Sequence, residues 1–125
     1  MSLFHAVVWV DHHTAQVLQF DAAQVLEKQV KAHEHYTRQH GSEVRSEHEF
    51  FGAVCDAMQG ITEVLIAGSH TAQADFRHYV EKHRPEVAHH IVGWETTGNL
   101  TTHELVALAR RYFTTHAGMA SPMKS

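Results

Sequence analysis

Several features that would place a protein in a special class are scarce or missing in this sequence. Its 125 residues include only one cysteine and two prolines. The single cysteine, Cys55, excludes an internal disulfide and is typical of a reducing compartment. No apolar run approaches the roughly 18 residues of a membrane-spanning helix. The first residues also lack the basic and apolar stretches of a signal peptide. The sequence therefore predicts a cytoplasmic protein with no membrane partner.

The residues that are present indicate one compact domain. Hydrophobic residues make up 43% of the chain and charged residues 19%, which is a globular rather than a disordered composition. We predict that this single domain covers residues 1–113. Residues 114–125 offer little to bury, so we expect them to form a flexible C-terminal tail.

Histidine is abundant and makes the net charge depend on pH. The chain contains 14 histidines, and its formal net charge is −4 at pH 7 when they are counted as neutral. Near pH 6.5, the ordinary pKa of histidine, protonation of about half of them brings the net charge to about +3. Because the sign changes just below neutrality, charge alone does not decide between classes of partner.

The hydrophobic pattern predicts five strands. Segment 4–10 is β-branched and aromatic, and partial alternation over 15–21 predicts an antiparallel hairpin with it. A third, shorter strand over 25–32 carries the charged residues of an exposed edge. Segments 62–67 and 91–96 are predicted as the fourth and fifth strands.

The first helix is predicted to begin at a capping box. Ser46 and Glu49 have the Ser-x-x-Glu spacing, in which each side chain bonds the other residue's backbone amide. Apolar residues then recur at helical spacing as far as Gly60. The preceding residues, 33–45, are polar with few apolar anchors, so we expect a long loop there.

Two more helical regions complete the chain. After a turn at 68–71, apolar residues share one face of a helix. Pro85 either interrupts this helix or starts a short extension to His90. Thr101 and Glu104 form a second capping box, which opens the last helix. Strand–helix–strand crossovers favour parallel pairing and right-handed connections. The predicted fold is therefore a three-layer α/β/α, ribonuclease H-like arrangement, with a five-stranded mixed sheet of order 3-2-1-4-5 and an antiparallel second strand.

This sheet predicts a crevice between strands one and four. Ligands of open α/β sheets bind beyond the carboxyl ends of the strands, at the point where the strand order reverses. The residues expected there are Asp11, His12, Gly68, Ser69, His70, Thr71 and Glu95. Each also has a simpler structural interpretation, as a turn-closing Asp, a permissive glycine or a solvated polar residue.

The histidines and the cysteine offer two further candidates. His33, His35, His40 and His48 could bind zinc or nickel, but such spacings arise by chance when histidine is so frequent. Cys55 falls on the apolar face of its helix, so we expect a core residue rather than a nucleophile. We therefore predict no metal, no cofactor and no catalytic residue.

The segment 35–45 is a candidate RNA contact. Exposed aromatic, Arg and His side chains can bind phosphates and stack on unpaired RNA bases. Ordinary solvation of a polar loop is the alternative interpretation. The residues concerned are Tyr36, Arg38, Gln39, His40 and Arg45.

Three short segments carry a family pattern by their order and spacing. They are 7–15 (VVWVDHHTA), 46–54 (SEHEFFGAV) and 64–76 (VLIAGSHTAQADF). Together they resemble the central domain of archaeo-eukaryotic class I release factors and of Pelota, and more closely their short bacterial relatives. The resemblance covers most of residues 4–113 and implies the ribonuclease H-like fold and a link to translation. It also places segment 35–45 where the family reaches into ribosomal RNA.

The chain departs from this family in two places. Release factors carry Gly-Gly-Gln before the first helix to promote peptidyl-tRNA hydrolysis, whereas residues 38–42 here read RQHGS and the tripeptide occurs nowhere in the sequence. Pelota lacks it too, so the family link stands without termination activity. The family's lysine position is Gln73 here, and its Pro-Gly is Ser69 and His70.

The expected function is a noncatalytic, translation-associated module that contacts RNA or the ribosome. Two alternatives from other classes remain. The chain could be a divalent-metal-dependent, ribonuclease H-like phosphodiesterase that uses Asp11, His70 and Glu95. It could also be a structural interaction protein that forms a homodimer through an exposed edge strand.

Overall fold

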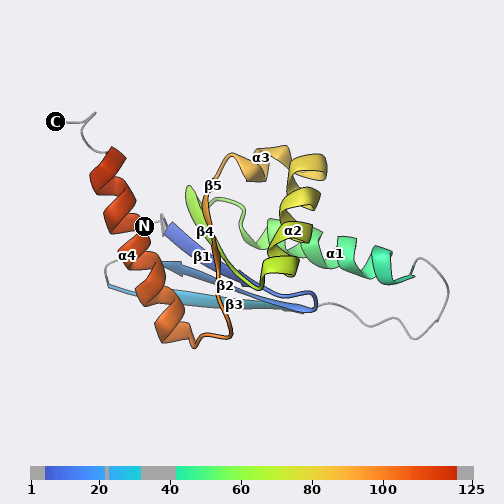
Figure 1. Cartoon of the computed structure of the whole chain (residues 1–125), viewed down its shortest axis with the longest axis horizontal. Coiled ribbons are helices and arrows are strands. Elements are labelled where there is room, and N and C mark those ends of the chain that lie inside the picture. The colour runs from blue at the N-terminus through green and yellow to red at the C-terminus, as the bar shows by residue number, and fades with distance from the viewer. Residues whose placement is uncertain (1–4, 22, 32–41, 121–125) are drawn as a thin grey trace.

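Three strands come first along the chain, and helices and two further strands follow them, all around one mixed sheet (Figure 1). The computed structural model describes residues 5–21, 23–31 and 42–120, and of residues 42–46 and 116–120 it describes the backbone only. The elements in these residues are β1 (His5–Val10), β2 (Thr14–Phe20), β3 (Val25–Lys31), α1 (Ser42–Ala57), β4 (Glu63–Gly68), α2 (His70–His83), α3 (Pro85–Ala88), β5 (Ile91–Thr96) and α4 (Thr102–Ala120). None of the described helices combines the length and the hydrophobicity needed to cross a membrane.

The strand order of the sheet is β3-β2-β1-β4-β5. β2 pairs antiparallel with β1 and with β3, whereas β4 pairs parallel with β1 and with β5. The parallel pairs require crossovers, which α1 provides before β4 and which α2 and α3 provide before β5. The predicted order and the antiparallel second strand are confirmed.

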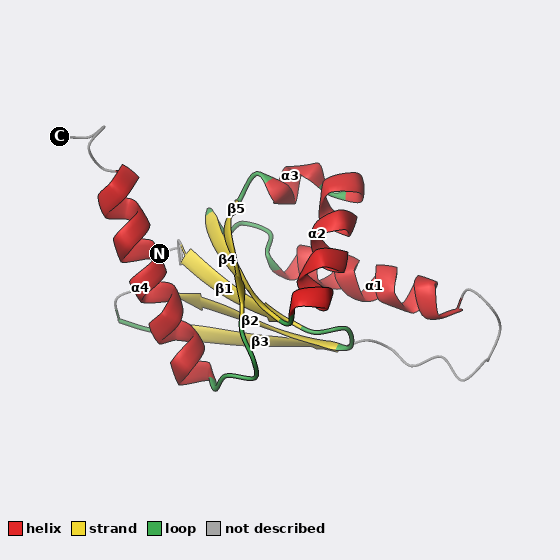
Figure 2. Cartoon of the chain, viewed as in Figure 1, coloured by secondary structure: helices red, strands yellow, loops and turns green. Residues whose placement is uncertain are grey.

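Helices cover both faces of the sheet, which confirms the three layers (Figure 2). α1 and α2 pack on one face, with Val8 and the partly buried Trp94 in their hydrophobic cluster. α4 packs on the other face, with Val7 and the partly buried Trp9. Successive side chains of a strand point to opposite faces, so adjacent residues of β1 supply different cores.

β3 is an exposed edge, as the sequence predicts. All of its residues are exposed except the partly buried Val30. Leu26 is 55% exposed, but the charged residues Glu27 and Lys28 follow it and oppose pairing with a strand of another chain. The homodimer stays a prediction.

The start of α1 differs from the prediction. The helix begins at Ser42, four residues before Ser46, so the predicted capping box and the predicted end of the loop at residue 45 are wrong. The Ser-x-x-Glu pattern only caps a helix where the first backbone amides lack intrahelical partners. Inside α1 the same spacing has no such amides to bond. Residues 33–41 lie outside the described residues.

The second capping box is confirmed. The Thr101 backbone N–H donates to Glu104 Oε1 at 2.8 Å, and the Glu104 N–H donates to Thr101 Oγ1 at 3.1 Å. α4 then continues to Ala120, beyond the predicted domain boundary. Phe113 is buried and the two threonines after it are exposed. The boundary at residue 113 stays a prediction.

The end of β4 leaves no room for a side chain at Gly68, which lies opposite Val10 of β1. Gly68 has φ +142°, which L side chains rarely adopt. A Cβ at this position would collide with the carbonyl oxygen of Val10. Only glycine therefore allows the two strand ends to meet in this way.

We expect Gly68→Ala to lower the free energy of unfolding by about 3 kcal/mol, because the backbone strain and the collision with Val10 add together. Urea unfolding followed by circular dichroism measures this change. Gly98→Ala is the matched control, since no atom lies within 4 Å of a Cβ built there. Equal losses in the two variants would contradict this account of the strand ends.

Candidate functional site at the carboxyl ends of β1 and β4

The carboxyl ends of three strands meet at the predicted crevice. β1 and β4 are aligned with Val10 opposite Gly68, and β5 places Thr96 opposite Gly68 on the other side. The turn after β1 is closed by a hydrogen bond from the Asp11 N–H to the Thr14 carbonyl, 2.9 Å long. The turns that begin at Asp11 and Ser69 therefore lie side by side, as the sequence predicts.

The buried amide of Gln73 holds these strand ends together. Its Nε2 donates to the carbonyl oxygens of Gly68 and Glu95, each at 2.8 Å. The Thr97 backbone N–H also donates to the Gly68 carbonyl at 2.8 Å. Gln73 is 6% exposed and is the buried polar residue of the described part of the chain. Sequence analysis missed this role, because main-chain partners on two other elements leave no signal near residue 73.

The start of α2 uses its polar residues for the helix itself. Ser69 is the N-cap, and its Oγ accepts a hydrogen bond from the Ala72 N–H at 3.3 Å. His70 and Thr71 are exposed on the first turn. Ser69 therefore has a structural role, as the cap of α2, rather than a ligand-binding one.

Glu95 lies on the face of the sheet opposite α2. It pairs with Ala67, which packs in the α4-side cluster, and neighbours in a parallel pair point to the same face. Burial and the nearby Glu95 carboxylate raise the pKa of Tyr112, a residue of α4. The preceding residue, Trp94, packs on the α2 side.

The three residues of the phosphodiesterase alternative are consequently not brought together. His70 lies at the start of α2, whereas Glu95 faces the α4 layer. Within the described ranges, the group of side chains close enough to share a metal ion is a different one and contains neither Asp11 nor Glu95. This geometry gives no support to a two-metal or carboxylate-based hydrolysis at the crevice.

His12 turns away from the strand ends toward α2. Its Nε2 lies 3.2 Å from Asp75 Oδ2, and its Nδ1 lies 3.9 Å from Asp11 Oδ1. The histidine is thus held between two carboxylates, one in its own turn and one on the helix.

A shallow groove of about 230 Å³ lies beside these strand ends, between α2 and β5. Its lining residues are His70, Gln73, Ala74, Arg77, Trp94 and Thr96. The guanidinium carbon of Arg77 lies 5.3 Å from the centroid of the Trp94 ring, a cation–π contact. A flat cation and an indole at an open groove are the groups on which unpaired bases stack. Sequence analysis missed both residues, because they lie 17 positions apart on different elements.

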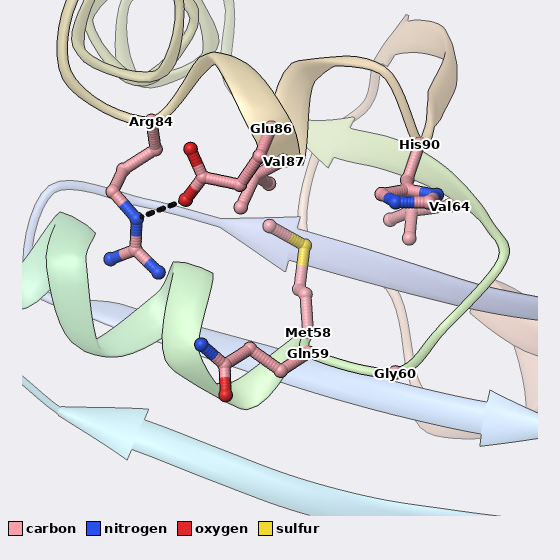
Figure 3. A pocket seen from close by; sticks show the side chains of 8 residues that line it. All are labelled: Met58, Gln59, Gly60, Val64, Arg84, Glu86, Val87 and His90. Carbon is pink, nitrogen blue, oxygen red and sulfur yellow. Dashed lines mark hydrogen bonds and ion pairs between the residues drawn. The ribbon is translucent and has the colours of Figure 1, made fainter.

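A second hollow, of about 200 Å³, lies at the opposite end of the sheet, near the start of β4 (Figure 3). Its lining residues are Met58, Gln59, Gly60, Val64, Arg84, Glu86, Val87 and His90. Arg84 bonds Glu86 at 2.9 Å and Asp56 at 3.1 Å, and these carboxylates raise the pKa of Arg84 above its usual range. A guanidinium already paired with two carboxylates offers little to a further anion, so we assign this hollow no ligand.

Cys55 is a core residue, as the sequence predicts. It is fully buried in the cluster beneath α1 and α2. Burial raises its pKa to about 12. The thiol therefore stays protonated at neutral pH and is not a nucleophile.

The candidate RNA-contact residues fall largely outside the described residues. Four of them, Tyr36, Arg38, Gln39 and His40, lie in the range 32–41. The fifth, Arg45, is described only as backbone within the first turns of α1. Their role stays a prediction.

Solved structures of translation factors share this fold. The chain is similar to Pelota of Archaeoglobus fulgidus with a TM-score of 0.70 and 16% sequence identity, over 96% of this chain and 35% of that one. It is similar to the archaeal translation termination factor aRF1 with a TM-score of 0.59 and 14% identity, over 81% of this chain and 32% of that one.

A third similar structure is Saccharomyces cerevisiae Dom34, a translation termination-like factor involved in RNA quality control that interacts with Hbs1. Its TM-score is 0.53 and its identity 10%, over 97% of this chain and 38% of Dom34. Neither the protein-family models nor the curated proteins contain a match to this sequence.

These likenesses confirm the expected fold class. The chain has the α/β fold found in part of Pelota and of the archaeal release factor, and it spans about a third of the length of each similar protein. The resemblance first drawn from three short segments is thus confirmed for the fold.

Removing the Gln73 amide should destabilise the strand ends. We expect Gln73→Leu to lower the free energy of unfolding by about 1–3 kcal/mol, because the Glu95 carbonyl loses its side-chain donor and the Gly68 carbonyl loses one of two. Urea denaturation gives the value. Gln59→Leu, an exposed change in the turn after α1, is the control and should stay within about 0.5 kcal/mol. A Gln73 variant as stable as the control would show that the two bonds contribute nothing.

The buried thiol should be protected from reagents. We expect Ellman's reagent at pH 8 to label native Cys55 at least about 100-fold more slowly than the urea-unfolded chain, because burial both raises the pKa of the thiol and blocks access. The chain has one cysteine, so the absorbance reports this site alone. Rapid labelling of the native protein would contradict the core assignment.

Proposed function

We propose that the protein is a noncatalytic module of the translation machinery that contacts the ribosome through RNA. The observation that carries this proposal is the likeness to Archaeoglobus fulgidus Pelota over 96% of the chain with a TM-score of 0.70. The other two similar structures are a translation termination factor and a termination-like factor. A ribosomal partner would place the protein in the cytoplasm, as the single cysteine also suggests.

The proposed contact is the segment 35–45, with Tyr36, Arg38 and Arg45 as its phosphate- and base-binding residues. This segment leads into α1, and Figure 1 shows the first turns of α1 extending past the ends of the strands. α1 packs against α2 in the core, because the ring centroid of the buried Phe51 lies 5.2 Å from that of the buried Phe76. An RNA contact built here would thus be joined to a rigid frame.

Two observations support the noncatalytic part of the proposal. The sequence contains no Gly-Gly-Gln, the tripeptide that release factors use for hydrolysis. In the part of the chain that the structure describes, Asp11, His70 and Glu95 do not form a metal-ligating group. The function we propose is therefore recognition of a partner rather than chemistry.

We expect the protein to sediment with ribosomes in low salt, and more strongly at pH 6.2 than at pH 7.5. Protonation of histidines makes the chain more positive at the lower pH, and phosphate contacts release counterions. Replacing Arg38 and Arg45 by Gln should weaken binding about tenfold and reduce the slope of log affinity against log salt by about 1 to 2.

A matched control removes the same charge elsewhere. Lys82→Gln combined with Arg111→Gln changes exposed cations on α2 and α4 and should leave most of the binding intact. If the protein sediments with ribosomes neither at pH 6.2 nor at pH 7.5, the proposed function is refuted. Equal weakening by the two double variants would refute segment 35–45 as the contact.

A further inference from the structure

Three metal-ligating side chains from three separate elements converge next to the β1–β2 turn. His12 lies in that turn, Glu47 lies in α1 and Asp75 lies in α2. One ligand atom of each residue lies within 4.8 Å of the other two. His12 Nε2 and Asp75 Oδ2 are already 3.2 Å apart. Ligand atoms around a tetrahedral zinc ion are about 3.4 Å apart, so small side-chain rotations would bring all three to one ion.

The surroundings of His12 suit a metal ligand. Its Nε2 faces the cluster, while its Nδ1 lies 3.9 Å from Asp11 Oδ1. Histidines that bind metals commonly donate their second ring N–H to a carboxylate, which orients the ring and makes it a stronger ligand. Asp11 stands at the position such a carboxylate takes, one small rotation from hydrogen-bond distance.

We propose that His12, Glu47 and Asp75 bind one divalent transition-metal ion, of which zinc is the natural probe. An imidazole nitrogen with two carboxylate oxygens suits zinc and its neighbours better than magnesium, which prefers an all-oxygen shell. Three protein ligands leave a fourth position for water or another ligand. The His12 and Asp75 side chains are 34% and 53% exposed, so an ion can reach them from solvent.

Such an ion would connect segments that are distant in the sequence. It would join the β1–β2 turn to α1 and α2, on which the proposed RNA contact also depends for its position. Because the unfolded chain does not hold the three ligands together, binding would stabilise the folded state. The proposal does not rest on the ribosomal function, since its test measures zinc alone.

Isothermal titration calorimetry with zinc chloride, on protein freed of metal by EDTA, tests the site. We expect one ion per chain at this site, and an affinity at least about tenfold lower in each of His12→Gln, Glu47→Gln and Asp75→Asn. The protein carries many other histidines, so two controls are needed. His13→Gln changes an exposed neighbour in the same turn, and His83→Gln changes a histidine whose ring lies 5.5 Å from that of His48. Both controls should bind zinc as the wild type does.

Thermal unfolding supplies an independent readout. Zinc should raise the Tm of the wild type and of both controls, EDTA should reverse the rise, and Asp75→Asn should show little of it. Three outcomes would overturn the proposal: no binding by the wild type, full binding by all three ligand variants, or an equal loss of affinity in the control variants. The last two would identify adventitious binding by surface histidines. Circular dichroism confirms that each variant is folded before it is compared.

Discussion

The parallel contact between the ends of β1 and β4 is the constraint on which the rest of the structure depends. Val10 and Gly68 lie opposite each other, and a Cβ at Gly68 would collide with the Val10 carbonyl oxygen. This contact places the β1–β2 turn beside the start of α2. It therefore explains how His12 can reach Asp75, 63 residues further along the chain. Without this pairing, the β1–β2 turn would not lie beside the start of α2, and the metal-ligating cluster would not form.

Gln73 shows how a polar side chain can serve a structural purpose at such a junction. Its amide bonds the main chain of β4 and of β5, and so closes one end of the sheet in the place where a ligand would otherwise bind. The open groove beside it, with Arg77 over Trp94, lies between α2 and β5.

Much of the fold could be predicted because its signals are local. β-branched strands, the capping box at Thr101 and Glu104, and the break at Pro85 each depend on neighbours in sequence. The predicted start of α1 is wrong because it too was read from a local pattern. Ser46 and Glu49 have the spacing of a cap, but inside the helix there are no unpaired amides for them to bond. The candidate site was harder to predict from the sequence. The crevice followed from strand order, but the pairing of His12 with Asp75 and the placement of Glu95 on the far face depend on long-range register, which no local pattern contains.

The two tryptophans of the chain divide between the two cores. Trp9 packs with the α4 layer and Trp94 with the layer of α1 and α2. Each indole therefore senses the polarity on one side of the sheet only. Replacing one tryptophan at a time by Phe would give two fluorescent versions of the protein, each reporting when its own layer opens. Coincident emission changes would show that both layers melt as one cooperative unit, and separate changes would show that one helix layer detaches first.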